Sequence, residues 1–257
     1  MNESKWLFIG TDRRLKACSE LMEGAGYRCQ IIQTDAYSTE LEEALIDFAP
    51  NHIVFPILEM AGTLPVDLLA KDAKLYTGVV SEAWLKPFVD AGLTINSYLR
   101  EEIFIWENAR LTAEAFINVF YSQMGRTILN KDFQVAGYGR VGKMVADTLR
   151  ALGGRVTIIA RSEAQLGEAA SRGFQTKRLN DTVSLAGSYF VNTIPAQWLP
   201  IQKERPLFIF DLASAPGCLI DAGPSEYYTI LPGLPGKYFP LDAAIALKDA
   251  LERIYRR

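Results

Sequence analysis

The chain has 257 residues, and 49% of them are hydrophobic, which is typical of a globular protein with a sizeable core. Its 27 lysines and arginines against 30 aspartates and glutamates give a net charge of −3, so charge gives no reason to expect nucleic-acid binding. No apolar run approaches the roughly 20 residues of a membrane span, and residues 1–5 show no signal-peptide pattern.

Cysteines and histidine are too few and too scattered to predict a metal centre or a disulfide framework. Cys18, Cys29 and Cys218 form no CxxC pair, which favours a reducing, cytoplasmic location. The single histidine, His52, precedes an apolar stretch. We interpret it as a polar residue at the entrance of a strand, with a general base as the alternative, and we expect no metal site.

Short apolar runs and amphipathic segments alternate along the first hundred residues. Ser38 suits the N-cap of one helix, and Pro50 follows the end of the same helix. The predicted elements are a strand at 5–10, a helix at 12–25, a strand at 28–32, a helix at 38–49, a strand at 52–56, a strand near 74–77, a helix at 81–91 and a strand at 92–95.

The second half repeats this alternation after a predicted connector at 98–110. Its predicted elements are a helix at 112–124, a strand at 133–136, a turn at 137–142, a helix at 141–152, strands at 155–160, 189–193, 207–212 and 228–231, and a last helix at about 241–254. Alternating strands and helices predict an α/β fold with two Rossmann-like domains, parallel sheets and a cleft between the domains. We expect a substrate domain at 1–107, completed by the C-terminal helix 241–257, and an NAD(P)-binding Rossmann domain at 108–240.

The turn GYGRVG at 137–142 fits the dinucleotide-binding fingerprint, because it follows a predicted strand, opens a helix and precedes a second strand. Gly137 permits the sharp turn, Gly139 lets the pyrophosphate approach the backbone, and Gly142 lets the helix pack closely on the sheet. The phosphates then meet the helix N-terminus. The intervening residues Tyr138, Arg140 and Val141 are expected to contact the cofactor.

The end of the second strand of this domain favours a phosphorylated cofactor. NAD sites usually carry Asp or Glu about 20 residues after the first glycine, but here Arg161 and Ser162 stand there and the first carboxylate is Glu163. An arginine can pair with a 2′-phosphate, and a serine hydroxyl can add a hydrogen bond. We therefore predict NADP as the preferred cofactor, with NAD possible.

Two later segments end predicted strands and are expected to line the same site, since ligands bind at the carboxyl ends of parallel strands. They contribute the candidate cofactor contacts Thr193, Ile194, Pro195, Leu212 and Ala213. Asp211 lies in the second segment, either at the site or as the cap of a turn.

An ordered set of motifs carries a resemblance to a known family. The motifs are GYGRVG (137–142), ARS (160–162), VNTIP (191–195), FDLASAPG (210–217), LPGLPGK (231–237) and TAE (112–114). With them the chain resembles the A subunit of bacterial dipicolinate synthase, a sporulation enzyme, over roughly residues 106–240. The resemblance implies oxidation of a dihydrodipicolinate-type ring to dipicolinate with a nicotinamide cofactor, in company with a flavoprotein-like B subunit. A small dicarboxylate substrate and a homo-oligomer are expected.

Three segments depart from the family pattern: a compact loop at 56–62, a connector at 108–115 without the expected proline and glycine, and 238–242, where smaller residues would be expected. The nucleotide site therefore transfers more securely than the substrate.

The implied reaction needs groups that bind two carboxylates and one that accepts a proton. Candidates for the carboxylates are Lys237, Ser214, Thr112 and Arg110, and Glu114 is the candidate base. Each of them is alternatively a solvated side chain or a helix cap, and Thr112 suits the N-cap of its helix.

Two other functions remain open on the sequence. One is a shikimate-dehydrogenase-like NADP enzyme, which a catalytic Lys–Asp pair in the first domain would favour; Lys71 and Asp72 are neighbours, but on a strand they would point apart. The other is a non-catalytic nucleotide-binding subunit.

Overall fold

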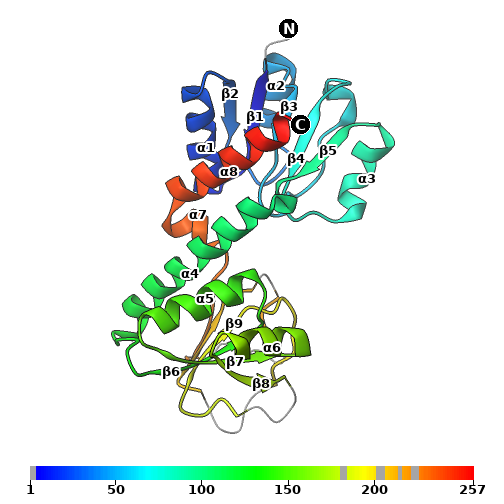
Figure 1. The fold of residues 1–257 in the computed structure, drawn as a ribbon. Coiled ribbons are helices and arrows are strands. Elements are labelled where there is room, and N and C mark those ends of the chain that lie inside the picture. The colour runs from blue at the N-terminus through cyan, green and yellow to red at the C-terminus, as the bar shows by residue number, and fades with distance from the viewer. Residues whose placement is uncertain (1–3, 180–183, 201–205, 214–215, 221–225) are drawn as a thin grey trace. The chain divides into compact units, whose positions relative to one another are not determined.

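The computed structural model describes residues 4–179, 184–200, 206–213, 216–220 and 226–257. The chain divides into two compact units: the first comprises Met1–Asn108 and Pro235–Arg257, the second Ala109–Leu234. Each unit contains a parallel β-sheet with helices packed on it, so the predicted α/β class with two Rossmann-like domains is confirmed (Figure 1). The second unit ends at Leu234, whereas the sequence analysis expected the Rossmann domain to end at residue 240. Lys237 therefore belongs to the first unit.

The first unit is built on five parallel strands in the order β2-β1-β3-β4-β5. Its strands are β1 (Lys5–Ile9), β2 (Arg28–Ile32), β3 (His52–Val54), β4 (Lys74–Thr77) and β5 (Thr94–Ser97). Its helices are α1 (Arg13–Gly24), α2 (Thr39–Phe48), α3 (Glu82–Asp90), the 3-10 turns η1 (Val66–Leu68) and η2 (Tyr98–Arg100), and α8 (Pro240–Tyr255). The predicted cap of α2 is present, with Ser38 Oγ accepting from Leu41 N at 3.2 Å.

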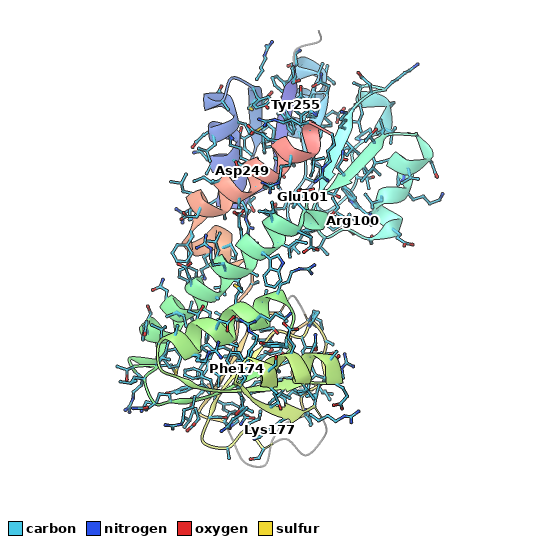
Figure 2. All side chains as sticks on the ribbon, in the orientation of Figure 1. Arg100, Glu101, Phe174, Lys177, Asp249 and Tyr255 are labelled. Carbon is cyan, nitrogen blue, oxygen red and sulfur yellow. The ribbon has the colours of Figure 1, made fainter. Side chains whose placement is uncertain are left out.

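Both faces of this sheet are buried, because successive residues of β1 alternate between two apolar clusters. Trp6 and Phe8 pack with residues of α1 and α8, and Leu7 and Ile9 pack with residues of α2 and α3. The C-terminal helix α8 thus closes one face of the first sheet. A buried carboxylate adds to this attachment, since Glu101, which is labelled in Figure 2, pairs with Arg253 at 3.2 Å and with Arg257 at 2.7 Å.

The long helix α4 (Glu102–Met124) begins ten residues before the predicted start at 112. The predicted connector 98–110 is therefore wrong over most of its length. Residues 102–111 contain no proline or glycine to stop a helix, and Phe104 and Leu111 are buried. Thr112 consequently lies inside the helix, 7% exposed, and is not its N-cap.

The second unit contains six parallel strands in the order β11-β10-β9-β6-β7-β8. They are β6 (Asp132–Ala136), β7 (Arg155–Ala160), β8 (Gln175–Arg178), β9 (Tyr189–Asn192), β10 (Phe208–Asp211) and β11 (Tyr228–Ile230), with helices α5 (Arg140–Ala151) and α6 (Glu163–Ser171); α7 (Leu234–Tyr238) follows them. From β6 the chain winds first toward β7 and β8 and then back to β9. This reversal is the topological switch point of a doubly wound sheet.

Candidate functional site

The glycine turn lies at this switch point of the second sheet. Gly137 directly follows β6, and Thr193 directly follows the neighbouring strand β9. The two segments are tied together, because the Thr193 hydroxyl donates to the carbonyl oxygen of Ala136 at 2.8 Å and the Thr193 N–H donates to the same oxygen at 2.9 Å. In doubly wound sheets, ligands bind in the crevice at this place.

The three glycines of the turn differ in what surrounds them. Gly137 has a φ of +91°, and an added Cβ would clash with Thr193 Oγ1. A Cβ on Gly142 would clash with the carbonyl oxygen of Gly137. A Cβ on Gly139, by contrast, would meet no atom within 4 Å. The first and third glycines thus serve packing, and the second leaves open space beside the backbone, which fits a cofactor pyrophosphate.

Helix α5 begins at this open space. Its N-cap residue is Gly139, and no side chain caps the helix among the residues that the structure describes. The first backbone N–H groups of a helix lack intrahelical partners and carry its positive dipole end. The start of α5 therefore offers donors to an anion.

The residues between these glycines contribute unequally. The Tyr138 side chain is 1% exposed and packs edge-to-face on Phe174 with ring centroids 6.2 Å apart, so only its backbone lies at the turn. Phe174, on which the Tyr138 ring packs, is labelled in Figure 2. Arg140 is exposed on the first turn of α5, and Val141 is half-buried.

Two buried polar side chains at the ends of β9 and β10 organise the loops that follow. The Asn192 amide donates to Ile194 O at 2.9 Å and to Asp211 Oδ1 at 2.8 Å. Its oxygen accepts from the N–H of Ile194 at 3.1 Å and from Trp198 Nε1 at 3.2 Å. Asn192 therefore fixes the loop that carries Thr193, Ile194 and the exposed Pro195, a role that the sequence analysis missed.

Asp211 is fully buried and also accepts from the Ala213 N–H at 3.1 Å and from the Tyr228 hydroxyl at 2.9 Å. These bonds hold Leu212 and Ala213 after β10. Gly217, with φ +94°, leaves room for the Tyr228 hydroxyl. Burial and the adjacent Asp211 raise the pKa of that hydroxyl above its usual range. Of the two interpretations from the sequence, the arrangement supports Asp211 as the cap of a turn.

Arg161 and Ser162 lie at the carboxyl end of β7, as their place in the sequence predicted. Both are exposed, and Ser162 Oγ caps α6 by accepting from the Gln165 N–H at 3.4 Å. Since β7 is the strand next to β6, Arg161 follows the second strand of the dinucleotide-binding half of the sheet. This is where the adenosine ribose of a dinucleotide would lie.

The candidate catalytic residues are spread over both units. Glu114 and Arg110 form an exposed ion pair on α4 at 2.7 Å, while Thr112 on the same helix is buried. Lys237 is exposed on α7 in the first unit, with its ammonium 5.6 Å from the centre of the Tyr238 ring. Ser214 lies outside the described residues.

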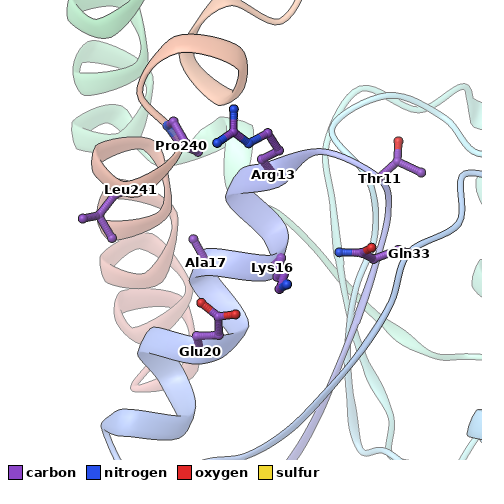
Figure 3. A pocket seen from close by; sticks show the side chains of 8 residues that line it. All are labelled: Thr11, Arg13, Lys16, Ala17, Glu20, Gln33, Pro240 and Leu241. Atoms are coloured by element: carbon purple, nitrogen blue, oxygen red, sulfur yellow. The ribbon is translucent and has the colours of Figure 1, made fainter.

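The first unit holds a groove of about 450 Å³ that the sequence did not predict. Figure 3 shows its polar side chains Arg13, Lys16 and Glu20 on α1, and the start of α8 beside them. Thr11, Ala17, Gln33, Pro240 and Leu241 complete the lining. None of these is a predicted site residue.

His52 is a core residue. It is 5% exposed, stacks on Trp6 with ring centroids 4.2 Å apart, and its Nδ1 lies 3.0 Å from the Tyr76 hydroxyl. Burial, assisted by the charge of Lys74, lowers the pKa of His52 to about 4. This agrees with a polar residue at a strand entrance. Lys71 and Asp72 are exposed in a turn before β4, so the strand position considered for them is wrong.

None of the helices in the described ranges has the length and hydropathy needed to cross a bilayer. In the same ranges, no three acidic, histidine or cysteine side chains gather as metal ligands would.

A family profile for the TrkA-N domain matches residues 133–183, which contain the glycine turn. The A subunit of dipicolinate synthase from Bacillus subtilis (strain 168) is 31% identical in an alignment of 175 residues, and the match covers 62% of this chain. The chain resembles the dipicolinate synthase A subunit. The matched segment covers 57% of the Bacillus subtilis protein's length.

Crystal structures extend the resemblance to the whole fold. The dipicolinate synthase A subunit from Bacillus halodurans superimposes with a TM-score of 0.80 at 22% identity, covering 99% of this chain and 98% of that one. The A chain from Bacillus subtilis gives a TM-score of 0.77 at 20% identity, with 100% and 97% coverage. NAD-dependent formate dehydrogenase from Staphylococcus aureus, solved in complex with NAD, gives 0.53 at 14% identity, with 98% and 95% coverage. The fold is thus that of two-domain dehydrogenases.

Proposed function

We propose that this chain is an oxidoreductase subunit that binds a nicotinamide dinucleotide at the switch point of its second sheet. The observation that carries the proposal is the open space beside Gly139, at the uncapped start of α5, between two glycines whose positions tolerate no side chain. Such a turn can hold a pyrophosphate by backbone N–H groups alone.

The cofactor we propose is NADP. Arg161 and Ser162 follow β7 at the place where an NAD site usually has a carboxylate. A guanidinium can donate two parallel hydrogen bonds to a phosphate, and the Ser162 hydroxyl, which accepts in its cap bond, still has its own proton to donate. NAD remains a candidate at lower affinity.

The reaction we propose is the one implied by the resemblance to the dipicolinate synthase A subunit. Held at the glycine turn 137–142, the nicotinamide cofactor would supply a hydride acceptor for a dihydrodipicolinate-type ring, which would become aromatic with loss of a proton from the neighbouring position. Glu114 is exposed and can receive that proton, and its ion pair with Arg110 orients the carboxylate. Lys237, Thr112 and Ser214 are the candidates for holding the two carboxylates.

A second, flavoprotein-like partner (the B subunit), a homo-oligomeric state and a cytoplasmic location are part of the same proposal. Support for the partner comes from the similarity to a protein named as one subunit of a synthase. The location rests on the three cysteines, which are free in the structure.

The proposal is tested by titrating the purified protein with NADPH and with NADH and following nicotinamide fluorescence. Arg161→Ala is expected to weaken NADPH binding at least about tenfold, because a charge-assisted contact is lost. Arg155→Ala is the matched control. Arg155 is the first residue of the same strand, at the end opposite to Arg161, and it pairs with Asp132. Equal weakening by both variants would remove Arg161 from the site.

Turnover separates the remaining alternatives. Formation of dipicolinate with NADP supports the proposed reaction, and a requirement for the flavoprotein-like partner supports the proposed complex. Nucleotide binding without turnover of any dihydrodipicolinate in the presence of that partner would favour a non-catalytic role. For a shikimate-dehydrogenase-like activity the structure offers little support, since Lys71 and Asp72 lie exposed in a turn.

A further inference from the structure

Four polar residues from two separate segments of the chain lie at the carboxyl ends of β7 and β8. Arg178 is the last residue of β8, and its Cα pairs with that of Ala160, the last residue of β7. The next residues are also joined, since the Leu179 N–H donates to Ala160 O at 2.9 Å. We call Arg161, Ser162, Glu163 and Arg178 the charged corner.

One ion pair lies inside the charged corner. Nη1 of Arg178 is 2.9 Å from Oε1 of Glu163, the first residue of α6. The Arg178 side chain is 67% exposed and that of Glu163 is 71% exposed, so water and salt screen the pair. An exposed pair of this kind contributes little to stability, and a stronger anion can replace its carboxylate at small cost.

This ion pair places the guanidinium of Arg178 beside the residue that follows Ser162. The side chain of Arg178 therefore reaches the segment where the proposed 2′-phosphate would be bound. A phosphate carries more negative charge than a carboxylate and has three acceptor oxygens, so it can engage two guanidinium groups and a hydroxyl at once.

We propose that Arg178 is a second phosphate-binding residue, which pairs with Glu163 in the cofactor-free protein and exchanges this partner for the 2′-phosphate of NADP. The inference rests on the proposed function and deepens it, because it names the group that separates NADP from NAD. Arg161 supplies one guanidinium to the phosphate. With Arg178 added, two cations from adjacent strands hold it.

Glu163 acquires a definite role in this arrangement. Its carboxylate competes with the phosphate for Arg178 and repels the phosphate as a like charge. It thus weakens NADP binding without touching the nicotinamide or the pyrophosphate. A cofactor without the 2′-phosphate would leave the Glu163–Arg178 pair intact.

The test compares the affinities of NADPH and NADH for three single variants of the full chain, measured by fluorescence titration. Arg178→Ala removes the proposed phosphate ligand, and Glu163→Gln removes its competitor. Lys177→Ala is the matched control, because Lys177 is an exposed cation one residue earlier whose side chain lies on the opposite face of β8. Thermal unfolding of each variant checks that the fold is retained.

We expect Arg178→Ala to weaken NADPH binding about tenfold and to change NADH binding less than about twofold. Glu163→Gln is expected to tighten NADPH binding about threefold, and Lys177→Ala to leave the ratio of the two affinities unchanged. The NADPH loss of Arg178→Ala should shrink at high salt, since the contact is electrostatic.

Several results would overturn the inference. If Arg178→Ala weakens both nucleotides equally, or no more than Lys177→Ala does, Arg178 does not read the 2′-phosphate. If Glu163→Gln weakens NADH instead, then Glu163 binds a ribose 2′-hydroxyl and the corner is an NAD site. Failure of the wild-type chain to bind either nucleotide would reject the proposed function itself, which is a different outcome from normal binding with unselective variants.

Discussion

The two units use the same strand–turn–helix arrangement in opposite ways. In the first unit, Gly10 follows β1, but Asp12 caps the next helix, accepting from the Arg14 N–H at 2.9 Å. The Arg14 guanidinium is 3% exposed and pairs with Asp12 at 3.1 Å and with Asn108 at 3.1 Å. In the second unit, Gly139 occupies the cap position of α5 and leaves it open.

The difference shows what makes a helix start available to a ligand. In the first unit, a carboxylate of the chain itself occupies the anion position, and Gly236 packs so closely on Asp12 that a Cβ there would clash with the carboxylate. In the second unit, no described side chain competes for the helix N–H groups. The strand order of each sheet is compatible with both arrangements. The cap residue therefore decides whether the helix start is filled by a side chain of the protein or is open to a ligand.

Removal of the Asp12 carboxylate is expected to have the largest effect on stability. Asp12→Ala takes away the helix cap and leaves the buried Arg14 without its carboxylate partner, so that, of the described residues, Asn108 alone still accepts from its guanidinium. We expect a loss of about 3–5 kcal/mol in the free energy of unfolding of the first unit, measured by urea denaturation followed by tryptophan fluorescence. Trp6 and Trp84 lie in the cores of this unit and report on it.

Asp12→Asn serves as the control. Its amide oxygen can still accept the Arg14 N–H, so it should cost clearly less than Asp12→Ala. Equal costs for both variants would show that charge pairing with Arg14, and not the cap, dominates this turn. A cost below about 1 kcal/mol for Asp12→Ala would contradict the buried pair altogether.

A second difference between the units is the buried histidine of the first sheet. The pKa of His52 is lowered from 6.5 to about 4 in the folded protein. Between pH 6.5 and about pH 4, His52 is therefore protonated in the unfolded chain and neutral in the folded chain. We expect this group to remove about 3 kcal/mol of stability as the pH falls through that window, and nothing above it.

The measurement is direct, because His52 is the only histidine in the chain. Its ring protons give a single NMR titration, which should show a pKa well below 6. His52→Gln keeps a hydrogen-bonding group beside Tyr76 and should lose this part of the acid sensitivity. A histidine that titrates near 6.5 would mean that the stack on Trp6 opens to water.

The smallest effect on stability is expected at Gly139, the N-cap residue of α5 in the second unit. Gly139→Ala places a methyl group in open space, at a φ of −80° that alanine adopts readily, so the unfolding free energy should change by less than about 1 kcal/mol. The methyl group would occupy the pyrophosphate position. We expect NADPH affinity to fall at least about tenfold.

Gly142→Ala provides the opposite pattern in the same turn. Its Cβ would press on the carbonyl of Gly137, so this variant should lose stability as well as binding. Unchanged NADPH binding by a stable Gly139→Ala protein would show that the turn binds no pyrophosphate.

Most of the fold could be predicted because its signals are local. The boundaries of β7 coincide with the predicted strand, and the Ser38 cap was predicted from its sequence position. The start of α4 could not be found in this way, because residues 102–111 have a mixed pattern whose helical form depends on the burial of Phe104 and Leu111. Strand β8 was missed for a related reason, since its sequence QTKR is polar and three of its four residues are exposed.

The candidate site also contains residues with a local sequence signal and residues without one. The glycines and Arg161 could be proposed as site residues from spacing alone, because a tight turn after a strand demands particular residue types at particular positions. Asn192 and Tyr228 were not, since their roles depend on hydrogen bonds to Asp211 from strands far apart in the chain.

Local signals were therefore enough to predict two parallel β-sheets with their helices, the glycine turn and the resemblance to the dipicolinate synthase A subunit. Backbone sterics and side-chain periodicity act over a few residues, and a sequence records them directly. The tertiary structure alone decided which helix start stays open, which carboxylate is buried at a strand end, and that Arg178 lies beside Glu163. Those features depend on the distance between segments that only the packing of the sheet brings together.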